Sequence, residues 1–247
     1  MKRIASVLLG SLMLLSACSD SEHSKPMSRE VSSLPEPESL AVDEAYPERL
    51  INIAYAQLSK SVEAAQALQS SAAALHKNAT PERLEEARGH WRASYSAYLS
   101  SLAASDIPVR EPSEWFAAKL TRRHLAQQIN SWPIEPGYID YLEGYPFTGI
   151  VNDTTLGIDR DSLLAQHQFS DATYVSVGYH AIEFILWGEH GQRPASDFDS
   201  TAAKPEEDDS SPVAHQQRRG DYLATLTDIL IADLQRLQMR WAPSPEA

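Results

Sequence analysis

The chain has 247 residues and a formal net charge of −13, and its content of 43% hydrophobic and 22% charged residues is ordinary for a globular protein. The acidic balance excludes a nucleic-acid partner, which would need a basic surface, and suits cationic partners such as metal ions. The single cysteine, Cys18, excludes an internal disulfide and any cysteine-rich metal site.

Residues 1–18 have the pattern of a bacterial lipoprotein signal peptide. Two basic residues precede the apolar stretch Ile4–Leu15, which is shorter than the ~20 residues of a membrane span. The stretch is followed by Ser-Ala-Cys, and Leu15-Ser-Ala-Cys18 resembles a lipobox. In that kind of signal the cysteine is acylated. We therefore expect Cys18 to anchor the chain to membrane lipid in the bacterial cell envelope. An Asp directly after the acylated cysteine often retains a lipoprotein in the inner membrane, but this chain has Ser19 at that position. The outer membrane, facing the periplasm, is therefore favoured. A secretory peptide with an incidental cysteine is the alternative.

Residues 19–43 are rich in Ser, Pro and Glu and lack periodicity, which predicts a flexible tether. Residues 44–243 read instead as an antiparallel helical bundle, so the predicted fold class is all-α. Apolar residues recur at helical spacing from Tyr46 to Leu75, Ile53 among them, and again from Leu84 to Leu102. The short break at residues 78–82 between the two rows predicts a helical hairpin.

The rest of the bundle is predicted with less regular connections. Helices are expected over Ser113–Asn130 and along the apolar face from Tyr222 to Trp241. Ser131–Asn152 is too apolar for a mobile loop and too rich in Pro and Gly for a helix, which favours an ordered, partly buried connection. Arg193–Pro212 is polar and acidic, which favours a solvated loop.

The densest chemical pattern is Gly178-Tyr-His180-Ala-Ile-Glu183 within an otherwise apolar segment. His180 and Glu183 are three residues apart, so a helix projects both side chains from one face. An imidazole and a carboxylate at this spacing can form half of a metal site inside a bundle, and Gly178 permits close backbone approach. The alternative is a buried polar contact, either within the pair or to the arginines at positions 122 and 123. Neither an H-E-x-x-H nor an H-x-x-E-H zinc motif is present.

These residues carry a family resemblance. The Gly178-x-His180-x-x-Glu183 pattern is similar to the G-x-H-x-x-E signature of the imelysin family of bacterial envelope proteins. The segment Trp132–Tyr141 resembles a second hallmark of that family, and the final helix running into Trp241-Ala-Pro resembles the connection out of its first bundle. The likeness covers roughly residues 44–243.

The resemblance implies an all-α exported protein, often lipid-anchored, that is associated with uptake of iron or other metals. It implicates His180 and Glu183 as metal ligands, with Asp140 and Glu135 as further ligands and Gly178 as a structural position. The expected cofactor is a transition metal ion, iron first and zinc or copper otherwise. The founding name of the family refers to a peptidase, so a metallopeptidase is the alternative function, although only two ligands are well supported. A non-metal helical scaffold that binds a partner protein is the third hypothesis.

Imelysin-like chains typically resemble two bundles in tandem, whereas this chain resembles one. We therefore expect that a homodimer could replace the second bundle, and that a transport partner in the envelope could receive the metal.

Overall fold

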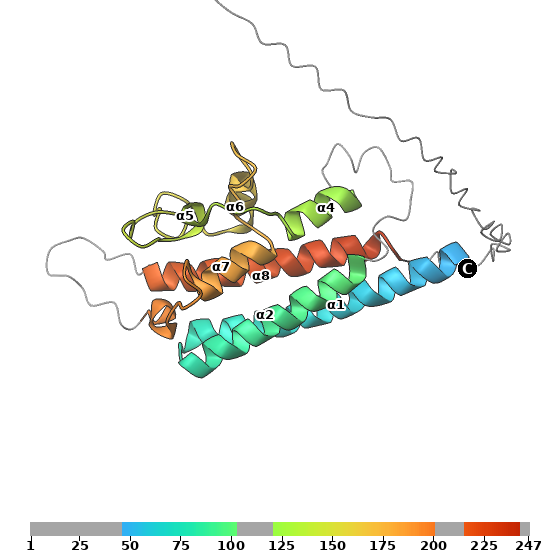
Figure 1. The fold of residues 1–247 in the computed structure, drawn as a ribbon, viewed down its shortest axis with the longest axis horizontal. Helices are drawn as coiled ribbons and strands as arrows, with labels where there is room; N and C mark the ends of the chain where they lie inside the picture. The colour runs from blue at the N-terminus through green and yellow to red at the C-terminus, as the bar shows by residue number, and fades with distance from the viewer. Residues whose placement is uncertain (1–45, 103–120, 201–214, 243–247) are drawn as a thin grey trace, which may run out of the picture. The chain divides into compact units, whose positions relative to one another are not determined.

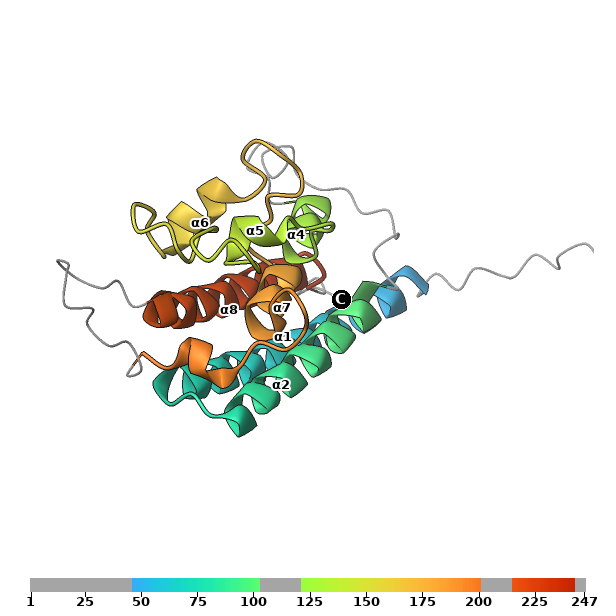
Figure 2. The same cartoon turned by 60° about the vertical axis from the view of Figure 1, so that its left-hand side comes forward.

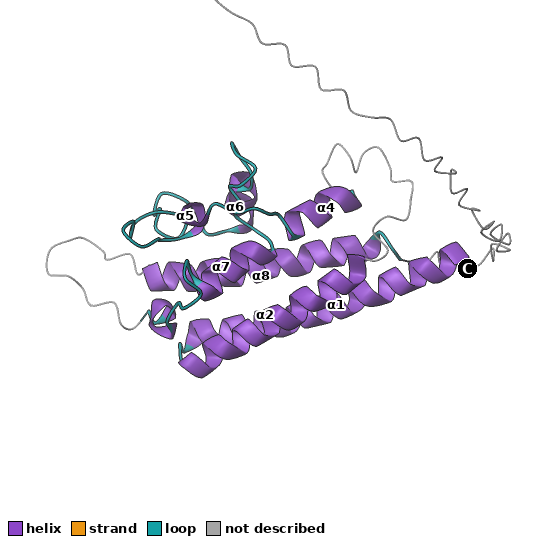
Figure 3. Ribbon diagram, in the orientation of Figure 1, coloured by secondary structure: helices purple, strands orange, loops and turns teal. Residues whose placement is uncertain are grey.

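A computed structural model describes residues 46–102, 121–200 and 215–242, and those ranges contain helices and loops but no strand (Figures 1 and 3). The predicted all-α fold is confirmed. The predicted signal peptide and tether lie outside the described residues, as do residues 113–120 of the predicted third helix. The helices are α1 (Tyr46–Lys77), α2 (Pro81–Ser101), α4 (Arg122–Ile129), α5 (Pro136–Ile139), α6 (Arg160–Gln166), α7 (Tyr179–Trp187), the 3-10 helix η2 (Ala195–Phe198) and α8 (His215–Met239).

Helices α1 and α2 form the helical hairpin that the sequence predicts. Thr80 caps α2, because its side-chain oxygen accepts a hydrogen bond from the Arg83 amide at 3.3 Å. Pro81 occupies the first turn, where a missing backbone N–H costs nothing, and Glu82 complements the helix dipole. Alanines and leucines on the facing sides are fully buried, Leu68 and Ala87 among them.

Helix α8 packs antiparallel to α1. Gln238 donates a hydrogen bond to Ser59 at 2.8 Å and Gln69 donates one to Asp228 at 2.5 Å, so residue numbers fall along α8 as they rise along α1. The short helix α7 contacts both α2 and α8 (Figure 2), and α4 lies on α8. Apolar side chains of α7 and α8, such as Ile185 and Leu226, are completely buried in the same core as those of the hairpin.

One residue of the predicted apolar row on α1, Ile53, lies on the surface and not in the core. Ile53 is 54% exposed, whereas its neighbour Ala54 is buried. Counting back one helical turn of 3.6 residues from the buried Leu58 reaches Ala54 and not Ile53. The core face therefore begins at the smaller side chain.

The sequence predicts an ordered connection at Ser131–Asn152 and a solvated loop at Arg193–Pro212, and the structure agrees with the first of these predictions only. In Ser131–Asn152, Ile139 and Asp140 are fully buried, in agreement with an ordered connection. The predicted solvated loop Arg193–Pro212 is wrong for its first residues, because Arg193 and Phe198 are 4% and 1% exposed. Residues 201–212 of that loop lie outside the described part. Among the described residues, no helix combines the length and apolar content that a membrane crossing requires.

Candidate functional site

Gly178 sets where α7 begins. Its φ of +93° lies in a region that side chains with a β-carbon rarely adopt. A β-carbon there would lie 2.5 Å from the Gln128 carbonyl oxygen and 2.7 Å from that of Ile129. The absence of a side chain thus lets the start of α7 approach the end of α4, as the sequence pattern predicted. His180 follows two residues later.

Helix α2 fixes α7 at both ends. The Trp91 indole donates a hydrogen bond to the Tyr179 carbonyl at 2.9 Å, next to His180. At the other end, Arg88 donates from Nε and Nη2 to the Leu186 carbonyl at 3.1 and 2.9 Å. A buried guanidinium therefore satisfies a terminal carbonyl of α7 and places a positive charge at the negative end of its dipole.

His180 and Glu183 lie one helical turn apart and contact each other. His180 Nδ1 and Glu183 Oε2 are 2.8 Å apart. Because an ionised carboxylate can only accept, Nδ1 donates this hydrogen bond, and when the ring is neutral its free lone pair lies on Nε2. Nε2 makes a long contact of 3.4 Å with the Tyr95 hydroxyl. The His180 side chain is 12% exposed and that of Glu183 is 42% exposed, so the pair is at the edge of the core and not enclosed by it.

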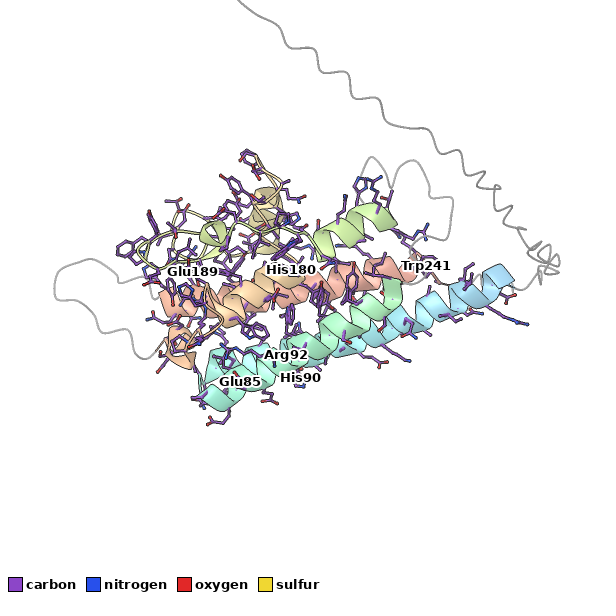
Figure 4. The ribbon with its side chains drawn as sticks, in the orientation of Figure 1. Glu85, His90, Arg92, His180, Glu189 and Trp241 are labelled. Atoms are coloured by element: carbon purple, nitrogen blue, oxygen red, sulfur yellow. The ribbon has the colours of Figure 1, made fainter. Side chains whose placement is uncertain are left out.

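The pair lines a pocket of about 470 Å³, which we call the His180 pocket. Its lining is mostly aromatic: Trp91 from α2, Trp132 from the connection after α4, and Trp187 at the end of α7. The Trp132 ring lies 4.9 Å from the His180 ring, centre to centre, and the residue is 67% exposed. Figure 4 labels three residues of this pocket: His180 on α7, Glu189 beyond the end of α7, and Arg92 on the neighbouring α2.

The structure corrects the predicted role of Asp140. This carboxylate is completely buried between two arginines: Arg219 donates to Oδ2 at 2.6 Å and to Oδ1 at 3.0 Å, and Arg193 forms an ion pair with Oδ2 at 2.9 Å. Asn152 and the Tyr141 amide also donate to Oδ1. Burial by itself raises the pKa of Asp140, but the Arg219 hydrogen bond and the charges of Arg193 and Arg219 outweigh it and lower the pKa. Asp140 is the anion of a buried ion cluster, and both its oxygens are occupied.

Glu135 is not gathered to the pair either. It is exposed at the residue before α5, and the His180 pocket is not lined by it. Throughout the described ranges, no group of three or more His, Cys, Asp or Glu side chains is arranged to hold a metal ion. The predicted set of four ligands therefore reduces to two adjacent side chains, His180 and Glu183. The predicted alternative is a contact from the pair to Arg122 and Arg123. Both arginines line another pocket, where the Arg122 guanidinium lies 4.5 Å from the centre of the Trp241 ring.

Sequence reasoning missed three residues of the site. Trp132 is the first residue of the hallmark segment Trp132–Tyr141, and Trp91 lies within the apolar row from Leu84 to Leu102, so neither is marked by its sequence as a pocket residue. Arg92 carried no signal, because an arginine on an exposed helix face is ordinary. What connects them is tertiary: Arg92 lies 5.0 Å from the Trp187 ring, and Trp132 reaches His180 from a segment 48 positions earlier.

Comparison with protein-family models finds a match over residues 54–247 with the model described as imelysin, peptidase M75. A search of curated proteins finds no match.

Proposed function

The chain belongs to the imelysin family, and on that basis we propose that it is an envelope protein that captures a transition-metal ion, iron first, for uptake or delivery. Family membership indicates a metal-related or peptidase-like function. The metal is the cargo of this function, and zinc and copper are the other candidates.

The His180–Glu183 pair is the observation that carries the proposal. A histidine that binds a metal usually donates its second ring N–H to a carboxylate, which fixes the tautomer and makes the ligating nitrogen more basic. The 2.8 Å contact from Nδ1 to Glu183 has this form, and it leaves Nε2 as the metal ligand. Glu183 lies on the Nδ1 side of the ring, so in this arrangement it orients the ligating histidine and makes its Nε2 more basic.

The same residues favour capture over catalysis. A catalytic zinc site uses about three protein ligands, an open position and a base. Within the part of the chain that is described, two donors lie together and no group of three does. A peptidase mechanism would also need a base, for which Glu183 and Glu135 are the candidates. The Glu183 carboxylate is already hydrogen-bonded to His180, and Glu135 does not line the pocket.

We further propose that the acylated Cys18 tethers the protein to lipid, with the outer membrane facing the periplasm as the favoured location. The tether predicted over residues 19–43 would separate the bundle from the lipid surface. An envelope transport protein would receive the metal, and two chains together could supply the ligands that one chain lacks.

Metal titration of the purified mature protein, with a competing chelator as indicator, tests this function. His180→Ala and Glu183→Ala should each weaken binding of Fe³⁺ or Zn²⁺ by at least ~10-fold, with helicity unchanged. Binding should also weaken in acid, because a ligating imidazole must be deprotonated.

The matched control is the exposed pair His190 and Glu143, whose side chains lie 3.1 Å apart outside the His180 pocket. His190→Ala and Glu143→Ala should leave affinity unchanged. Equal affinity in wild type and the His180→Ala/Glu183→Ala double variant would reject the site. Cleavage of denatured polypeptide that is lost in Glu183→Gln would establish the peptidase alternative.

A further inference from the structure

We propose that the His180 pocket takes its metal as a ferric ion already held by an aromatic, anionic chelator of the catecholate class. This inference rests on the proposed function, because it requires His180 to bind the metal. It identifies the form in which the metal arrives.

The protein offers too few donor atoms to fill the coordination shell of a ferric ion. A ferric ion in octahedral coordination needs about six donor atoms, and the protein offers His180 Nε2, while the Glu183 carboxylate is held on Nδ1 of the same ring. No third His, Cys, Asp or Glu joins them anywhere in the described residues. Two bidentate catecholates supply about four oxygens, which are the hard donors that ferric iron accepts. An organic chelator therefore completes the shell that the protein leaves open.

The His180 pocket is larger than a metal ion requires. An ion with six waters occupies roughly 180 Å³, at about 30 Å³ for each water. The His180 pocket has about 470 Å³, which lies in the range of ~300–1,000 Å³ typical of sites for organic ligands. A bare or hydrated ion would leave most of this space unfilled.

The wall of the His180 pocket is mostly aromatic. Three of the five tryptophans in the chain line it, namely Trp91, Trp132 and Trp187. Trp132 is 67% exposed although its ring lies beside that of His180. A large aromatic face left open beside a metal ligand is suited to stack on an aromatic ring that the metal carries. An aliphatic chelator would gain much less from these faces.

An arginine in the His180 pocket suits an anionic ligand. A ferric ion with two catecholates carries one negative charge, and the protein has a formal net charge of −13. Arg92 lines the pocket and lies over Trp187, so its guanidinium can meet the anionic oxygens of the chelator. The two glutamates of the pocket are both hydrogen-bonded to neighbours: Glu183 to His180, and Glu189 to the Glu143 amide at 2.7 Å. Arg92 is therefore the charged group of the pocket that is suited to contact the anionic complex.

The test is equilibrium dialysis of the mature protein against four probes: ferric ion with two equivalents of catechol, ferric citrate, catechol alone, and Zn²⁺ alone. Ferric catecholate should bind at least ~10-fold more tightly than ferric citrate, and its visible charge-transfer band should shift when His180 enters the coordination shell. Trp132→Ala should weaken ferric catecholate binding about 10-fold and leave Zn²⁺ binding within about 2-fold. Arg92→Met should weaken ferric catecholate binding as well.

Two variants control for loss of an exposed aromatic or cationic residue elsewhere. Phe169 is 76% exposed and Arg123 lines a different pocket, so Phe169→Ala and Arg123→Met should change nothing. Equal binding of catecholate and citrate complexes, or no effect of Trp132→Ala, would overturn the inference while the proposed function stands. Equally tight binding of catechol alone would also overturn it. If no metal probe binds in any form, the proposed function itself is wrong.

Discussion

The Trp91 indole nitrogen donates a 2.9 Å hydrogen bond to the backbone carbonyl of Tyr179, which is the residue before His180. One side chain of α2 thus forms part of the pocket wall and fixes the backbone that carries the ligand. Any change that moves α7 relative to α2 or α4 is therefore expected to alter the site and the stability of the fold together.

Gly178→Ala should destabilise the protein, because a β-carbon would collide with the end of α4 and the φ of +93° would become strained. We expect the free energy of unfolding to fall by ~2–4 kcal/mol in chemical denaturation. Gly89→Ala is the matched control: nothing lies within 4 Å of a β-carbon there, so this mid-helix change should stabilise by ~0.5–1 kcal/mol. A neutral Gly178→Ala would contradict the close approach.

Asp140→Asn should cost ~3–5 kcal/mol of stability, because it leaves the buried Arg193 and Arg219 without their shared anion. The pKa of Asp140 is lowered in the folded state, so its stabilisation is present above the unfolded pKa near ~4 and is lost as the pH falls through the folded value. Denaturant unfolding of wild type below pH ~4 should show this loss, and the variant should lack it. The exposed Asp153 provides the control, since Asp153→Asn should change stability by less than ~1 kcal/mol.

His167 should make the fold sensitive to mild acid. Burial lowers its pKa from 6.5 to about 4, so the folded protein holds this ring neutral. The unfolded chain binds the proton first as the pH falls, so stability is intact above pH ~6.5 and declines toward pH ~4, by up to ~3 kcal/mol. His167→Gln should flatten this part of the pH profile in denaturant titrations, whereas the exposed His190→Gln should keep the wild-type slope. An unchanged profile in His167→Gln would mean that another group titrates.

Cys18→Ala should leave unprocessed precursor and abolish labelling with radioactive fatty acid, because acylation requires the thiol. The wild-type protein should fractionate with membranes. Recovery of wild type as soluble periplasmic protein without lipid would refute the anchor and leave the metal site unaffected.

The sequence by itself determined the helical class, the hairpin at residues 78–82 and the position of His180 and Glu183 on one face of a helix. Each depends on residues within about one turn of one another, where helix geometry sets which side chains share a face. The close backbone approach at Gly178 belongs to the same group, since glycine has no β-carbon to obstruct it.

Only the tertiary structure decided what surrounds the pair. Asp140 is 79 positions from Arg219 and 53 from Arg193, and these two arginines convert a candidate ligand into a structural anion. Spacing along the chain carries no information on such contacts, because burial forces a carboxylate to take whichever cation the packing brings to it. Trp132 reaches His180 for the same kind of reason, through the approach of α4 to α7 at Gly178.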